Sequence, residues 1–238
     1  MRWKAPHWEG LGVGRPRPYL CAMNNDQALQ ENSFSPAIRL TAKVISYIFH
    51  PLFVPVYVGW FFVEVLRLFT VLDDRHQSLL LVQFFVNYTL LPLVTVLIAK
   101  GVGFIDSIYL KTQRDRIIPY LAVMIFYFWV WYVFRNQGFP PEAVMFSFAA
   151  FLSVCFGVFV NSFFKVSMHA LSMGVVMTLL LLLSLKSTDN IGPYVSLGLL
   201  LTGIVCTARL INNDHRPFDV YAGLALGALA QVIAWLFV

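Results

Sequence analysis

Three side chains near the C-terminus have types and spacings suited to phosphate chemistry. Arg209, His215 and Asp219 lie where one apolar segment ends and the next begins. An arginine fork can hold two phosphate oxygens, and a histidine can attack phosphorus when a carboxylate holds its far ring nitrogen. If a helix starts near His215, a spacing of four places His215 and Asp219 on one face of it. The segment therefore predicts a phosphate site with a histidine nucleophile.

Two earlier segments also place polar side chains next to apolar runs. Lys111 and Pro119 bound a basic stretch that contains Arg116, and Ser167 and His169 follow a later apolar run. Each segment lies next to an apolar run, so the elements that position these groups decide whether they meet.

The composition excludes an ordinary soluble protein. Hydrophobic residues make up 59% of the 238 residues and charged residues 12%, with a mean hydropathy of +0.72. Soluble domains are roughly half apolar and a quarter charged. The chain has room for about six or seven membrane spans of roughly 20 residues each. We therefore expect an all-α, polytopic transmembrane helical bundle of six to seven spans.

The apolar runs give seven candidate spans within a single domain, residues 44–238. Residues 1–43 form a polar lead that we expect to be disordered, and Met23 is an alternative start. The candidate spans are Val44–Val63, Leu79–Ala99, Ile117–Phe134, Ala143–Phe164, Ala170–Leu185, Tyr194–Ala208 and Val220–Val238. From Pro119 to Ser167 the chain makes two of these crossings, and from His169 to Arg209 it makes two more, so all three polar segments should emerge on one face.

Small residues in the last span predict close helix packing. Asp219, Gly223, Gly227 and Gln231 recur every four residues and form a stripe on one helix face. Glycines in such a stripe let the backbone of a neighbouring helix approach closely. Close packing there would hold His215 and Asp219 rigidly.

The three segments resemble the motifs of the type 2 phosphatidic acid phosphatase superfamily of integral-membrane lipid phosphatases. The family motifs read K-x6-R-P, P-S-G-H and S-R-x5-H-x3-D, and the third often continues D-V-x-A-G, as Asp219 to Gly223 do here. The resemblance implies the helical core shared by these phosphatases and the haloperoxidases. The chain departs from the motifs at Ile118, Val166, Met168 and Ala208.

The resemblance also implies a role for each matching residue. His215 would be the nucleophile that forms a phosphohistidine, Asp219 would orient its ring, and His169 would be the general acid. The phosphate oxygens would be bound by Lys111, Arg209 and Ser167, with Arg116 as a nearby cation that can replace the family arginine at Ile118. No metal or other cofactor is implied.

The implied substrate is a lipid that carries a phosphomonoester or a diphosphate. A headgroup at the bilayer surface with its tails among the helices suits cations that lie beside apolar spans. One alternative is a relative that binds lipid phosphates without turnover, and another is a transporter. We expect no nucleic-acid partner, and the sequence indicates no oligomeric state.

We expect the protein in a bacterial inner membrane, with the side of the membrane that carries the site left open. Arg39, Lys43 and Lys100 put positive charge on the motif face, which the positive-inside rule assigns to the cytoplasm. The family usually faces outward. Other cations of this face are proposed phosphate ligands, so they do not decide the orientation.

Overall fold

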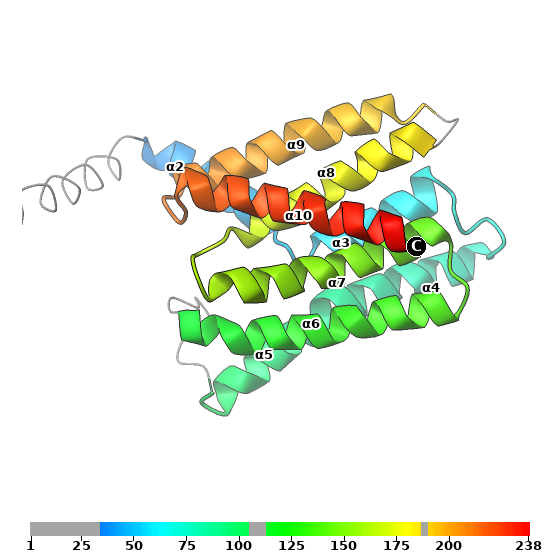
Figure 1. Cartoon of the computed structure of the whole chain (residues 1–238), viewed down its shortest axis with the longest axis horizontal. Helices are drawn as coiled ribbons and strands as arrows, with labels where there is room; N and C mark the ends of the chain where they lie inside the picture. The colour runs from blue at the N-terminus through cyan, green and yellow to red at the C-terminus, as the bar shows by residue number, and fades with distance from the viewer. Residues whose placement is uncertain (1–33, 105–112, 187–189) are drawn as a thin grey trace, which may run out of the picture.

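The computed structural model describes residues 34–104, 113–186 and 190–238, with the backbone alone for residues 113–118. Every regular element in these ranges is a helix, and the helices form a bundle (Figure 1). In chain order they are α2 (Pro36–Ile48), α3 (Val54–Trp60), the π-helical turn η1 (Phe61–Val65), α4 (Asp74–Phe85), the π-helical turn η2 (Val86–Leu90), α5 (Leu91–Gly101), α6 (Gln113–Asn136), α7 (Pro141–Asn161), α8 (Met168–Lys186), α9 (Gly192–Ile211) and α10 (Pro217–Phe237).

Five helical segments among the described residues are long and apolar enough to cross a membrane, where the sequence predicts six to seven spans. A shorter apolar helix, Val54–Val65, precedes them. The expectation of an all-helical integral membrane protein is confirmed at this level. The five segments are Asp74–Gly101, Pro141–Asn161, Met168–Lys186, Gly192–Ile211 and Pro217–Phe237.

The first predicted span, Val44–Val63, is broken in the structure. Helix α2 ends at Ile48 and α3 begins at Val54. The cause is Pro51, which has no N–H to donate to the carbonyl of Tyr47 and whose ring would clash with that carbonyl in a continuous helix. Hydropathy over a long window averages across such a break, so the sequence analysis missed it.

Helix α2 also starts earlier than the sequence analysis expects. Its first residues fall within the predicted polar tail, of which residues 1–33 lie outside the described part of the chain. The Ser35 hydroxyl accepts the N–H of Ile38 at 3.4 Å, and Pro36 occupies the first helical position. A serine cap followed by proline is a common helix start.

The last four carbonyls of α2 have no partners within the helix, as at any helix C-terminus. All four accept hydrogen bonds from donors beyond it. The donors are the N–H of Phe49 to Ile45 (2.9 Å), Nε2–H of His169 to Ser46 (3.0 Å), the N–H of His50 to Tyr47 (3.3 Å) and the hydroxyl of Tyr57 to Ile48 (2.9 Å). The end of α2 is thereby fixed against α3 and α8.

A second proline shapes the next span. Pro92 cannot donate to the carbonyl of Tyr88, and the preceding turn, η2, widens so that the N–H of Leu91 bonds to Val86, five residues back. Within this turn the Thr89 hydroxyl donates to the carbonyl of Leu52 at 2.6 Å. The widened turn therefore anchors the segment between α2 and α3.

Helices α8 and α10 pack with their backbones in close contact, as the glycine stripe predicts. A Cβ added at Gly227 would lie 2.0 Å from the carbonyl oxygen of Leu171, and one at Gly223 would lie 2.7 Å from that of Ser167. In the same way, a Cβ added at Gly174 of α8 would lie 2.4 Å from the carbonyl oxygen of Leu224 in α10. The contact brings the start of α8 against the start of α10.

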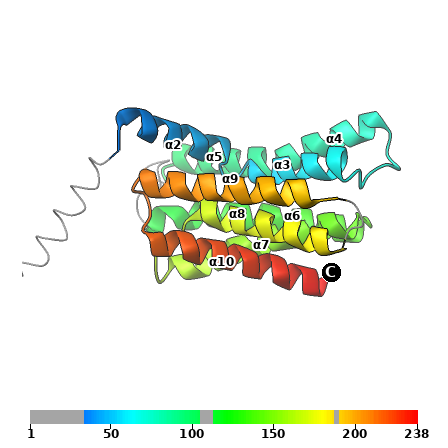
Figure 2. The same ribbon diagram turned by 90° about the horizontal axis from the view of Figure 1, so that it is seen from above.

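The polar segments lie at one end of the bundle. The connections α7–α8 and α9–α10 are at the left in Figure 1, together with the start of α6, while the C-terminus is at the opposite end. Figure 2, turned by 90°, shows the same arrangement with α2 to α5 along one side. The prediction that the segments emerge on one face is confirmed for the two that the structure describes in full.

Replacement of Gly227 by alanine should destabilise the protein. The added methyl group would overlap the backbone of α8, and overpacking of this kind costs about 1–3 kcal/mol. The loss is measured as a lower unfolding temperature in detergent. Gly203→Ala is the matched control, because a Cβ at Gly203 has open space and alanine favours a helix. Equal effects of the two substitutions would contradict the packing account.

Candidate active site

A cavity of about 420 Å³ opens among α5 to α8, with polar side chains gathered at one end. These are His50, His169, Arg209 and His215. The remaining lining is mostly apolar and includes Pro92, Val123, Phe146 and Val175, with hydroxyl groups from Tyr120, Tyr127, Ser153 and Ser172. The shape and lining suit a ligand with an anionic head and an apolar body.

Arg209 reaches the cavity from the last turn of α9, and its side chain is 12% exposed. The helix ends there because Asn213 adopts a left-handed conformation with φ 54°, which asparagine tolerates better than most residues. One terminal nitrogen of Arg209 pairs with Asp214 Oδ2 at 2.8 Å. Its Nε is buried and has no acceptor among the described residues, so the guanidinium keeps a donor for an anion.

His215 and Asp219 meet, although not on a helix face as the sequence analysis expects. Helix α10 begins at Pro217, so His215 lies in the preceding loop. Proline suits the first helical position and fixes the start of the helix two residues later than expected. His215 Nδ1 lies 3.7 Å from Asp219 Oδ2, and the two side chains are only 8% and 11% exposed.

Asp219 also holds the start of α10 in place. Its Oδ2 accepts the N–H of Arg216 at 3.0 Å, as a residue in the third helical position does in a capping box. Its backbone carbonyl accepts the N–H of Ser167 at 3.1 Å. One residue therefore faces His215, caps α10 and joins α10 to the chain that enters α8.

Ser167 is fully buried and caps α8. Its Oγ accepts the N–H of Ala170 at 3.5 Å, and Ser167 is not among the residues that line the cavity. Helix α8 begins at Met168, so Ser167 lies just before the helix and not in its first turn. A direct contact between Ser167 and phosphate stays a prediction.

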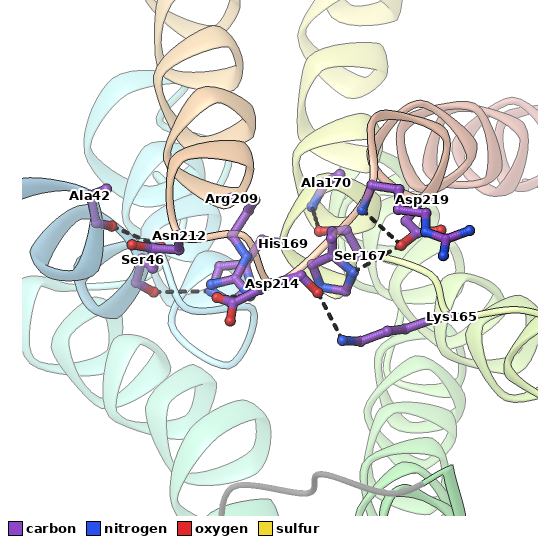
Figure 3. Close-up of polar contacts among 12 residues, drawn as sticks. Ala42, Ser46, Lys165, Ser167, His169, Ala170, Arg209, Asn212, Asp214 and Asp219 are labelled. Atoms are coloured by element: carbon purple, nitrogen blue, oxygen red, sulfur yellow. Dashed lines mark hydrogen bonds and ion pairs between the residues drawn. The ribbon is translucent and has the colours of Figure 1, made fainter. Parts of the chain in front are cut away.

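His169 is the second residue of α8 and lines the cavity. Its Nε2 lies 3.0 Å from the carbonyl oxygen of Ser46. A carbonyl can only accept, so Nε2 carries a proton and Nδ1 is the nitrogen left for proton transfer. The Asn212 side-chain amide donates to the Ser46 hydroxyl at 3.4 Å. Figure 3 shows how Ser46 connects α2 to both residues.

Lys165 is a site residue that the sequence analysis missed. Its ammonium group donates to the backbone carbonyl of Asp214 at 2.8 Å (Figure 3). The contact places a cation beside the loop that carries His215. The only sequence signal was its position two residues before Ser167. Asp214 and His50 were missed as well, because their roles depend on distant parts of the chain.

The first basic segment is only partly described. Lys111 lies outside the described residues, and the side chains of Arg116 and Ile118 do so too, although both residues belong to α6. Pro119 is buried and lines the cavity. Lys111 and Arg116 as phosphate ligands therefore stay predictions.

The surroundings of His215 keep its ring neutral. Its pKa is lowered to about 4, mainly because burial disfavours the charged ring and also because Arg209 and Lys165 are close. The carboxylates of Asp219 and Asp214 act in the opposite direction. At neutral pH His215 thus has a free lone pair, which nucleophilic attack requires.

No match to this chain was found among protein-family models, curated proteins or solved structures.

The lowered pKa of His215 predicts a pH-dependent stability. Between pH 7 and pH 5 the unfolded chain takes up a proton at His215 and the folded chain does not, so the folded state loses about 1–2 kcal/mol. Unfolding temperatures in detergent across this range measure the loss. His215→Gln lacks this proton uptake, so its unfolding temperature should fall less steeply between pH 7 and pH 5. Parallel pH profiles for the two proteins would refute the lowered pKa of His215 as the cause.

Proposed function

We propose that this protein is a membrane-embedded phosphatase that removes a phosphomonoester or diphosphate group from a lipid through a phosphohistidine intermediate. The proposal includes membership of the type 2 phosphatidic acid phosphatase superfamily, its haloperoxidase-like core and six to seven membrane spans, with α6 as one further crossing. A bacterial inner membrane is the proposed location.

The observation that carries the proposal is the grouping of Arg209, His169 and His215 at the polar end of an apolar cavity, with Asp219 behind His215. Arg209 retains a buried donor, and His215 is neutral at pH 7. Side chains that are far apart in sequence thus supply an anion ligand, a nucleophile and an acid in one place.

In the first step His215 Nε2 attacks phosphorus, because Nδ1 faces the Asp219 carboxylate. The bond between phosphorus and the lipid oxygen breaks. The leaving oxygen takes a proton from His169 Nδ1, which has accepted that proton from the monoanionic phosphate group of the bound substrate. Asp219 stabilises the positive charge that develops on the His215 ring. Arg209 binds the equatorial oxygens, across which the charge of the transition state is spread.

In the second step water hydrolyses the phosphohistidine. His169 Nδ1 accepts a proton from the water as its oxygen bonds to phosphorus, and the bond from phosphorus to His215 Nε2 breaks. Inorganic phosphate leaves together with the proton from His169 Nδ1, and the rings of His169 and His215 return to their neutral forms. The proposed mechanism uses no metal ion or other cofactor.

The alternative function is phosphate binding without turnover. It is favoured by the ion pair between Arg209 and Asp214, which occupies one nitrogen of the guanidinium. Ala208, which is buried where the family has a serine, also provides no hydroxyl group. Release of inorganic phosphate from a lipid phosphate by the detergent-purified protein separates the two functions.

We expect His215→Ala to lower phosphate release by about a thousandfold or more, because the covalent intermediate cannot form. The assay uses detergent-purified protein, a panel of lipid phosphates and diphosphates, and a chelator of divalent metals throughout. The control is His76→Ala, since His76 is exposed and pairs with Asp73 away from the cavity. Substantial activity in His215→Ala, or loss of wild-type activity with the chelator, would rule out the proposed mechanism.

Asp219→Asn should fold and turn over substrate at least a hundredfold more slowly. An amide oxygen can still accept the N–H of Arg216, but an amide does not stabilise a histidine cation as a carboxylate does. The thermal unfolding profile and the phosphate-release rate are measured on the same sample. Near-native turnover would restrict Asp219 to its capping role.

A further inference from the structure

His50 stands at the polar end of the cavity although it belongs to none of the three polar segments. It lies between α2 and α3, where Pro51 interrupts the first predicted span. The centroids of the His50 and His169 rings are 5.5 Å apart, with an angle of 86° between the ring planes. His50, His169, Arg209 and His215 all line the cavity.

The His50 ring is held in a defined orientation. The N–H of Leu52 donates to His50 Nδ1 at 3.4 Å, and the Leu52 carbonyl is itself held by the Thr89 hydroxyl. On the other side, the His50 carbonyl accepts the N–H of Phe53 at 2.8 Å. Since Nδ1 accepts a hydrogen bond, the proton of the neutral ring is on Nε2.

The neutral ring is also the form that the surroundings favour. Burial lowers the pKa of His50, and the Arg209 guanidinium lowers it further. A neutral N–H donor can bind a phosphate oxygen without adding positive charge beside Arg209. It differs in this respect from a lysine or arginine at the same place, which would repel Arg209 whenever the anion is absent.

We propose that His50 donates its Nε2–H to an oxygen of the bound phosphate group. This inference rests on the proposed function. The serine expected at position 208 is an alanine here, and Ser167 caps α8 away from the cavity lining. Two hydroxyl donors of the motifs are thus missing from the polar end of the cavity, and His50 supplies a donor from a different part of the chain.

The test is the affinity for inorganic phosphate and for orthovanadate, measured by titration calorimetry on detergent-purified protein. His50→Phe keeps an aromatic ring against His169 but has no donor, whereas His50→Gln keeps an N–H group. We expect His50→Phe to bind both anions about tenfold or more weakly than the wild type. The affinity of His50→Gln should stay within about threefold of the wild-type value. His76→Phe is the control for loss of an exposed histidine.

The outcomes separate this inference from the proposed function. If His50→Phe binds both anions with the affinity of the wild type, the proposed role of His50 is overturned and the phosphatase proposal stands. Equal weakening in the phenylalanine and glutamine variants also overturns it, because His50 would then act through packing. Binding without lipid phosphate hydrolysis overturns turnover but not the role of His50. A wild type that binds neither anion overturns both proposals.

Discussion

The close backbone contact between α8 and α10 is the constraint on which the site depends. Gly174, Gly223 and Gly227 leave no space for side chains between these helices. Because the backbones touch, the N–H of Ser167 reaches the carbonyl of Asp219, and the starts of both helices meet at one end of the bundle. The contact joins the segment that carries His169 to the segment that carries His215, and the positions of both rings follow from it.

The second requirement is that a cluster of basic side chains remain stable beside apolar spans. Asp214 meets part of it, since its carboxylate pairs with Arg209 and its backbone carbonyl accepts the Lys165 ammonium. Burial keeps His215 and His50 from carrying additional charge. Among the described residues that line the cavity, Arg209 therefore lies beside the neutral rings of His50 and His215. The rings can bind an arriving anion without adding charge that would repel Arg209.

The sequence predicts the features that depend on local composition. The apolar runs predicted helices, and the glycine stripe predicted that a neighbouring helix packs closely on the last span. That this neighbour is α8 was not predicted, nor was the break in the first span. The start of α10 was placed too early because Pro217 decides it, and the contact between His215 and Asp219 forms through a loop and not along a helix face. The pairing of His169 with Ser46 joins residues 123 positions apart. No pattern of spacing within either segment contains that information, and the same is true of Lys165 and His50.

The break at Pro51 has a consequence for the chemistry of His169. In an uninterrupted helix the N–H of His50 would bond to the carbonyl of Ser46, four residues earlier. Because the helix breaks, the N–H of His50 donates to the carbonyl of Tyr47 instead. The Ser46 carbonyl is then available to accept a hydrogen bond from His169 Nε2. Which ring nitrogen of His169 bears the proton is thus set by where α2 stops. The unwinding of one helix thus selects the tautomer of an imidazole on the helix that it contacts.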